Sequence, residues 1–462
     1  MSGPGNVGRS SKRSTRRSRP RPRGTVRREK NVRLPRPRLR RIGEVIRELE
    51  AEAAKGDGGD LSGFDGKLAE AALADAAEYA GEVVSAVERQ GAGPGVNRWR
   101  KGNLFTCMGW TRAEYPYYRD KARRGKRFGR FGVERNMTRT ASENVSRLGV
   151  LLGSFPEARD TLARLGLGRL SVSKVRAETL ARGKEAYDAM KSPAWDARRY
   201  PEKDRKLPEG ARPVPRTLLL LVDGTNVPAT KADTRGRKGK QGGEAKTRQL
   251  RVVSLCEYEA VTEKGRPIPL PGSFSYGIMS GDALELKGFV KKLAEARGAG
   301  QAARMQCGAD GEEALESILT DAFPRAVFFN DIMHAMSYLS TACRTLGIAE
   351  AEKEERICRA ILKRHGAASV VERLRRLYPD RLAASEEAAG ALDYLDKRRA
   401  HMNYGWLRKN GFYIGTSHVE EAARLLVARR CKQAGMHWRL GNAVRVCALL
   451  ARIRSSPRWS AA

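Results

Sequence analysis

The feature that most constrains the fold is an apolar run that ends in an acidic turn. Residues 216–229 read RTLLLLVDGTNVPA, and the part from Leu218 to Val222 has neither helical spacing nor alternation of apolar and polar residues. Such a run favours a short strand that is buried on both faces. We expect Gly224 to break the strand and leave the Asp223 carboxylate at its end. A carboxylate there is either held by hydrogen bonds, which is the commoner case, or placed to bind a metal ion.

Two more acids occupy comparable positions further along the chain. Residues 304–310, RMQCGAD, again predict a short strand that runs into Asp310, and a helical segment follows. A third acid, Glu420, follows the helix-start signal Gly-Thr-Ser at 415–417. Three carboxylates at one sheet edge suit two divalent cations, because these ions prefer oxygen ligands. Such a pair of ions activates water for phosphodiester cleavage.

Four segments resemble successive motifs of bacterial DDE transposases, in particular the Kra-type insertion-sequence family. The resemblance covers the chain from about Asn136 onwards, and its most specific parts are the Gly-Lys-Gln-Gly-Gly-Glu loop and the Lys-Gln-Ala-Gly-Met-His-Trp segment. It implies an α/β fold with an RNase H-like catalytic domain. The four segments are 222–250, 308–315, 330–339 and 413–438.

The resemblance also implies roles for individual residues. Carried over position by position, it makes Asp223, Asp310 and Glu420 the catalytic acids and the ligands of Mg²⁺, with Mn²⁺ as an alternative. Counting back from the motif at 432–438 selects Glu420 rather than its neighbour Glu421.

Asp331 and His334 match the family's Asp-x-x-His, and the resemblance implies that they hold a metal ligand or a DNA end in place. A helix-capping Asp331 and an ordinary buried His334 explain the same residues equally well. Tyr404, Trp406 and Tyr413 flank the approach to Glu420, and we expect them to be core residues rather than DNA stackers.

The charge of the chain indicates a polyanionic partner. The 462 residues carry a formal net charge of +36, and aromatic residues make up only 6%, which favours phosphate contacts over base stacking. We expect double-stranded DNA as partner, both element ends and target, and a homodimer or higher homo-oligomer. The seven cysteines form no CxxC pair, and no apolar run is long enough for a bilayer. These features predict a cytoplasmic protein with no membrane partner, and the resemblance implies that it is bacterial and nucleoid-associated.

Candidate DNA-binding residues lie in three places. A helix-turn-helix pattern puts Ser173, Lys174 and Arg176 at the start of its last helix, although many three-helix bundles share this pattern. A Gly- and Lys-rich loop supplies a second group, and the helix after Glu420, expected to end near Gly435, supplies a third. In that helix Arg424 replaces the family's usual lysine, and it either contacts a phosphate or pairs with an acid such as Glu421. The second and third groups are Lys238, Lys240, Lys246, Arg248, Arg424, Arg430 and Lys432.

Composition and pattern divide the chain into successive regions. The catalytic domain is expected to be interrupted by an all-helical insertion, since about eighty residues of helical pattern are too long for a plain connection. The region before it is expected to be mostly helical and to bind DNA. The regions are an Arg-rich disordered tail (1–41), helices with a small hairpin (42–135), a helix-turn-helix-like domain (136–190), a linker (191–215), the first catalytic part (216–334), the insertion (335–410) and the last catalytic part (411–462).

These features together predict a DNA transposase that cuts element ends and joins the 3′ hydroxyl to target DNA. Two alternatives stay open at this point. An RNase H-like nuclease would cut without joining, and a decayed transposase would only bind DNA.

The Arg-rich tail predicts a salt-dependent contribution to DNA affinity. Deleting residues 1–41 should weaken binding to any duplex and flatten the dependence of log K on log salt, because each neutralised phosphate contributes about 0.9 to that slope. Binding titrations of both proteins at two salt concentrations measure the slope. An unchanged slope would mean that the basic composition of the tail has no role in DNA binding.

Overall fold

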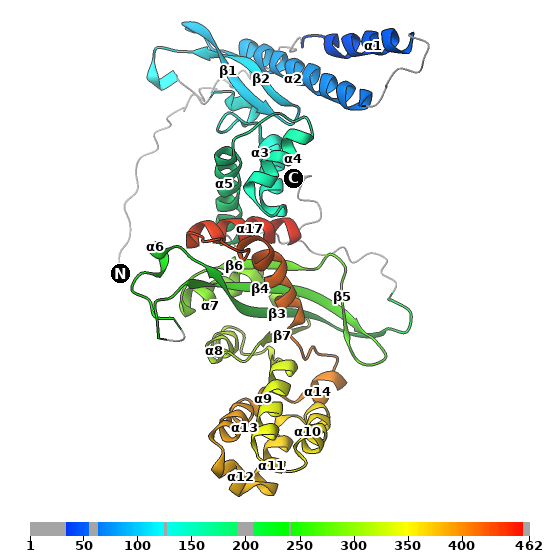
Figure 1. Ribbon diagram of the computed structural model, residues 1–462, viewed down its shortest axis with the longest axis vertical. Helices are drawn as coiled ribbons and strands as arrows, with labels where there is room; N and C mark the ends of the chain where they lie inside the picture. The colour runs from blue at the N-terminus through cyan, green and yellow to red at the C-terminus, as the bar shows by residue number, and fades with distance from the viewer. Residues whose placement is uncertain (1–33, 55–62, 124–126, 192–206, 240–241, 456–462) are drawn as a thin grey trace, which may run out of the picture.

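A computed structural model describes residues 34–54, 63–123, 127–191, 207–239 and 242–455. Most of the predicted tail (1–41), most of the predicted linker (191–215) and Lys240 therefore lie outside the described residues. Figure 1 shows three stacked parts: a hairpin with helices, a central sheet with its helices, and a helical unit.

The central part is a mixed sheet, which confirms the α/β class. Its strand order is β5-β4-β3-β7-β8, with β6 paired to β4. Strand β3 is antiparallel to β4 and parallel to β7, which is parallel to β8. The strands are β3 (Arg212–Pro228), β4 (Thr247–Val261), β5 (Pro267–Pro269), β6 (Ser275–Met279), β7 (Arg304–Ala309) and β8 (Val327–Asn330).

Strand β3 corrects one expectation. The strand does not end at Asp223, because β4 pairs with it as far as Pro228. Gly224 permits a close approach instead of breaking the strand. A Cβ atom at Gly224 would lie 2.3 Å from the Gln249 amide nitrogen and 2.6 Å from the Arg251 guanidinium. Asp223 therefore belongs to the strand itself, at the level where β4 carries Val252.

The apolar run of β3 lies in the core, as its sequence predicts. Every residue from Leu218 to Val222 is at most 1% exposed. Helices α7 (Ala283–Ala296), α8 (Glu313–Ala322) and α17 (Leu440–Ser455) contribute apolar faces to the same core. Across the described segments, none of the helices combines the length and the apolar character that crossing a membrane needs.

The predicted helical insertion is present and begins slightly earlier than expected, because Asp331 caps its first helix. Tyr404 is fully buried and Tyr413 is partly buried, but Trp406 is 48% exposed, so the expectation of a core residue is wrong for Trp406. The helices are α9 (Ile332–Thr345), α10 (Ala351–His365), α11 (Ala367–Leu377), α12 (Pro379–Ala384), α13 (Glu386–Lys397) and α14 (Tyr404–Lys409).

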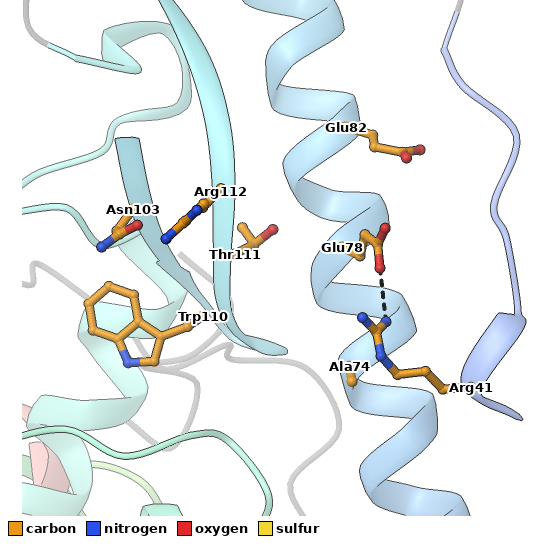
Figure 2. A pocket seen from close by; sticks show the side chains of 8 residues that line it. All are labelled: Arg41, Ala74, Glu78, Glu82, Asn103, Trp110, Thr111 and Arg112. Carbon is orange, nitrogen blue, oxygen red and sulfur yellow. Dashed lines mark hydrogen bonds and ion pairs between the residues drawn. The ribbon is translucent and has the colours of Figure 1, made fainter. Parts of the chain in front are cut away.

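The N-terminal part contains two long helices and a hairpin. The short aromatic and basic runs from Phe105 to Gly132 predict this hairpin, but its first strand begins earlier, at Arg98. A pocket of about 590 Å³ lies between the hairpin and α2, and Trp110 of the hairpin lines it (Figure 2). At this pocket Arg41 forms an ion pair with Glu78 at 2.9 Å. The elements are α1 (Arg40–Ala53), α2 (Phe64–Gly91), β1 (Arg98–Thr106) and β2 (Gly109–Tyr117).

The predicted three-helix pattern is confirmed as α3 (Arg139–Leu151), α4 (Phe155–Arg164) and α5 (Val172–Met190). Thr138, Ser154 and Ser171 cap these helices by accepting backbone N–H groups, which is why each helix starts where it does. The last of the three, α5, packs along α17, so this bundle is attached directly to the sheet domain (Figure 1).

Close packing at Gly183, between α5 and α17, and open space at Gly288 predict opposite effects of two Gly→Ala substitutions. At Gly183 a Cβ atom would lie 2.4 Å from the Arg445 carbonyl oxygen, so Gly183→Ala should lower the free energy of unfolding by about 1–3 kcal/mol. Gly288, on α7, has nothing within 4 Å, so Gly288→Ala should raise it by about 0.5–1 kcal/mol. Denaturant unfolding of both variants measures these changes, and equal effects would contradict close packing at Gly183.

Candidate metal centre

The parallel strands bring acidic side chains to one edge of the sheet. Leu221 of β3 pairs with Gly308 of β7, and Ala309 pairs with Asn330 of β8. Continuing the two registers by one or two residues puts Asp223 level with Asp310, and Asp310 level with Asp331. Because neighbouring strands lie about 4.7–4.9 Å apart, these aspartates form a row where β7 and β8 end, beside the part of the longer β3 that carries Asp223.

Glu420 reaches this row through a chain of hydrogen bonds. It lies on α15 (Ser417–Ala423), whose preceding loop is held when Ile332 donates its N–H to the Ile414 carbonyl at 3.0 Å. The Thr416 N–H donates to Asp331 Oδ2 at 2.8 Å. The Thr416 hydroxyl donates to Glu420 Oε1 at 2.9 Å. Asp331 therefore orients Glu420 by way of Thr416.

The tightest group of possible metal ligands differs from the set expected from sequence. Among the described residues, Asp331, His334 and Glu420 are the set whose ligand atoms all lie within 4.8 Å of one another. Asp223 and Asp310 lie outside this group, although both share its electrostatic environment. The predicted supporting residues Asp331 and His334 thus stand beside Glu420.

The pKa of Asp223 reflects its burial first and the negative charge at this edge second. Burial raises the pKa of Asp223 to about 6, with repulsion from Asp310 as the next cause and a smaller contribution from Glu420. The Gly224 N–H and the Arg251 charge oppose the rise. The carboxylates therefore repel one another across the edge, and a bound cation would relieve this repulsion.

Both oxygens of Asp331 are already committed to hydrogen bonds. Oδ1 accepts the His334 N–H at 2.8 Å and lies 3.2 Å from His334 Nδ1, while Oδ2 accepts from Thr416. Burial alone would raise the pKa of Asp331, but these hydrogen bonds outweigh burial and lower it. The Asp331 hydrogen bond raises the pKa of His334 against partial burial, and Asp310 and Glu420 add to the rise. Asp331 therefore caps α9 and also holds the site together, so its two sequence interpretations are compatible.

Four contacts that the sequence did not indicate support Asp310 and Asp223. Arg251 makes a bidentate ion pair with Glu312, both distances being 2.6 Å, and the Glu312 N–H donates to Asp310 Oδ1 at 3.1 Å. Tyr394 of the insertion donates to the Asp310 carbonyl at 3.3 Å. Lys432 donates to the Thr225 hydroxyl at 2.6 Å, two residues after Asp223. The only sequence signal for these was the charged Arg251 between the apolar residues Leu250 and Val252.

The predicted basic loop is partly described. Lys238 and Lys246 are exposed, and Lys240 lies outside the described residues. Arg248 is half-buried and donates to the Asp233 carbonyl at 2.9 Å, so this guanidinium stabilises the loop that carries the exposed lysines.

The helix after Glu420 corrects two expectations. It passes through a π-helical turn (Arg424–Ala428) and ends with α16 (Arg429–Cys431), before Gly435. Arg430 is only 2% exposed, donates to the Gly149 carbonyl and lies over the Phe155 ring, so it cannot continue a basic surface. Its burial in the interface with α3 and α4 is the physical reason.

Arg424 follows the second interpretation given above. It makes two hydrogen bonds to Glu421, at 2.6 and 2.5 Å, and both side chains are exposed. Mutual pairing lowers the pKa of Glu421 and raises that of Arg424. Arg424 is therefore paired with an acid. Lys432, by contrast, contacts Thr225 on β3, the strand that carries Asp223.

At the start of α5, two of the three predicted base-reading residues are exposed and the third is partly buried. Arg176 and Ser173 are exposed, and the Ser173 hydroxyl lies 2.9 Å from that of the cap Ser171. Lys174 donates to the Arg135 carbonyl at 2.5 Å, and burial lowers its pKa. Of the three predicted base-reading residues, Arg176 is the one whose side chain is both exposed and charged.

The donor set fits a hard divalent cation. It consists of carboxylate oxygens whose negative charges repel one another, which are the ligands that Mg²⁺ and Mn²⁺ prefer, with one imidazole at the margin. No protein-family model matches this chain, and no curated protein matches it either.

Repulsion at the sheet edge predicts how metal ions affect stability. Because the folded state raises the pKa of Asp223, the metal-free protein should lose stability as pH rises from about 4 through about 6. Asp223→Asn should remove this loss and raise the free energy of unfolding at pH 7 by about 1–3 kcal/mol in the absence of metal. Thermal unfolding at several pH values with a chelator measures the change.

Added Mg²⁺ should then stabilise the parent but not Asp223→Asn, because an ion that binds only the folded state raises its stability by mass action. Asp321→Asn, which alters an exposed acid paired with Lys287, is the matched control and should respond to Mg²⁺ like the parent. Equal Mg²⁺ responses of all three proteins would contradict a metal site at Asp223.

Proposed function

We propose that the protein is a DNA transposase of the DDE type, which cuts at element ends and joins the freed 3′ hydroxyl to target DNA. The observation that supports this most is the row formed by Asp223 on β3 and by Asp310 and Asp331, which directly follow the parallel strands β7 and β8, with Glu420 hydrogen-bonded to Thr416 beside it. The chain order also supports an RNase H-like fold. Three antiparallel strands come first, two parallel strands separated by helices follow, and Glu420 lies on a later helix.

The acids have distinct roles in this proposal. Asp223, Asp310 and Glu420 would hold Mg²⁺, which when bound lowers the pKa of a water nucleophile and neutralises charge on the leaving oxygen. Asp331 orients Glu420 through Thr416 and engages Nδ1 of His334, which leaves the other imidazole nitrogen for a phosphate oxygen or water. Hydrogen bonds of this kind keep the ligands in place when the site is strained by like charges.

Double-stranded DNA is the proposed partner, at the element ends and at the target. The net charge of +36 supplies the long-range attraction, and exposed Lys238, Lys246 and Arg176 supply contacts on two different parts of the molecule. Because an element has two ends, we propose that the protein acts as a homodimer or larger homo-oligomer in the bacterial nucleoid.

The Asp310→Asn variant tests the catalytic role. Loss of a metal ligand should reduce end cleavage by more than the roughly 10–100-fold that loss of a supporting residue causes, and binding to end DNA should not change. Asp321→Asn makes the same chemical change at an exposed acid and should keep full activity. The substrate is a fragment whose inverted repeats are taken from the DNA that flanks the gene, and cleavage is followed on sequencing gels.

A second arm of the same experiment separates the transposase from its alternatives. Pre-cut ends with a free 3′ hydroxyl are incubated with a supercoiled target plasmid, and joined products are counted. Joining by the parent protein supports a transposase, and cleavage without joining indicates a nuclease. Binding without either reaction indicates a DNA-binding protein, and full cleavage by Asp310→Asn would show that the ligand assignment is wrong.

A further inference from the structure

A second basic surface lies at the opposite end of the sheet from the acids. The turn between β4 and β5 follows Val261, which pairs with Arg212, and Asp223 comes eleven residues later on the same strand. At about 3.3 Å per residue, the two ends are on the order of 30 Å apart. A group bound at this turn therefore cannot be the phosphate that reacts at the acidic edge.

Three segments from distant parts of the sequence meet there. A Cβ atom at Gly265 would lie 3.1 Å from the Arg408 carbonyl, and one at Gly405 would lie 1.9 Å from the Arg364 carbonyl. These close approaches bring the β4–β5 turn, α14 and the end of α10 together, and Figure 1 shows α14 between α10 and the sheet. The exposed cations that gather there are Lys264, Arg266, Lys363, Arg364, Arg408 and Lys409.

None of these six cations has an ion-pair partner among the residues that the structure describes. Elsewhere on the sheet and the insertion, guanidinium groups form ion pairs, such as Arg251 with Glu312 and Arg373 with Glu354. The acid in the turn, Glu263, faces Gly210, where an added Cβ would lie 3.1 Å from its carboxylate. Glu209 lines the same pocket as Glu263, Lys264 and Arg266, so the six cations outnumber these two acids and the surface is net positive.

An aromatic ring stands among these cations. Trp406 is 48% exposed, although its ring stacks on Phe412 at 5.7 Å with an interplanar angle of 24°. The Arg304 guanidinium lies 4.4 Å from the centre of the Phe412 ring. The indole is thus held by packing while nearly half of it faces solvent, and a ring that is already immobilised loses little entropy when a base stacks on it.

We propose that the Trp406 patch, defined as Trp406 with these six cations, binds single-stranded nucleic acid. Phosphates would lie along the cations, and one base would stack on the exposed indole. Bases in a duplex present their faces to one another, so this stacking contact is open only to an unpaired or terminal base. The patch goes beyond the proposed function, because it does not depend on cleavage or joining.

The direct test is photo-crosslinking of the full chain to a short single-stranded oligonucleotide that carries 5-bromouridine or its deoxy form, followed by mass spectrometry. DNA and RNA oligonucleotides are separate arms, and crosslinking of either at Trp406 supports the proposal. Trp110, which is 42% exposed on the hairpin, is the internal control. Crosslinks confined to other aromatic residues would overturn the proposal.

Affinity measurements provide the second test. Trp406→Ala should weaken single-strand binding about tenfold, and Trp406→Phe should restore most of it, whereas Trp110→Ala should have little effect. Neutralising Arg408 and Lys409 to alanine should lower the salt slope for single strands by roughly 1.4, since each phosphate contact contributes about 0.7. Neutralising Arg376 and Arg381, exposed cations on the insertion away from Trp406, removes the same charge and should change the slope less.

The outcomes separate single-strand binding from its rivals. An equal loss of duplex affinity in Trp406→Ala would make the patch a duplex phosphate surface and overturn the proposal, as would unchanged single-strand affinity. Circular dichroism checks that the variants fold. If Trp406→Ala does not fold, the variant with Arg408 and Lys409 changed to alanine still decides the test. Since no cleavage is measured, failure here leaves the Asp310→Asn result untouched.

Discussion

The parallel pairing of β3 with β7, and of β7 with β8, is the constraint on which the candidate site depends. All residues from Leu218 to Val222 are buried, so this run holds β3 in the core, and the pairing of β3 with β7 places Leu221 beside Gly308. That register also fixes the level of Asp223 and Asp310 at the sheet edge. The hydrophobic core therefore positions the acids, and the acids themselves contribute repulsion rather than stability.

Hydrogen bonds made by Asp331 and by two tyrosines of the insertion hold the edge together despite this repulsion. Asp331, where β8 meets α9, holds the Thr416 loop, and Tyr404 at the far end of the insertion donates to the Asn330 carbonyl at 3.1 Å. Tyr394 reaches the Asp310 carbonyl next to Gly311, where an added Cβ atom would lie 1.8 Å from the Tyr394 hydroxyl, so the absence of a side chain leaves room for that ring. The insertion is thus tied to the catalytic edge at several points, so distortion of its helices would reach the acids directly.

Local pattern in the sequence was sufficient for the strand and helix order, for the three-helix pattern of α3 to α5 and for naming the three acids as candidates. It failed where a distant partner decides the outcome. Gly224 looked like a strand terminator, but β4 continues the pairing across it. Arg430 looked like surface charge, but the Gly149 carbonyl and the Phe155 ring bury it. Such partners lie in other elements, the next strand for Gly224 and a helix 281 residues away for Arg430, and no spacing rule within one segment can reveal them.

The same reasoning limits what net charge alone can say about DNA binding. Several arginines are structural: Arg430 is buried, and Arg297, 9% exposed, donates to the Ser273 carbonyl at 2.5 Å. Others are neutralised in pairs, as Arg216 is by Glu257. Attraction to a polyanion at short range comes from the cations left over, and their positions matter more than their number. Those near Trp406 and those of the Gly-rich loop lie toward opposite ends of one long strand pair, so a nucleic acid that touches both must run along the sheet domain.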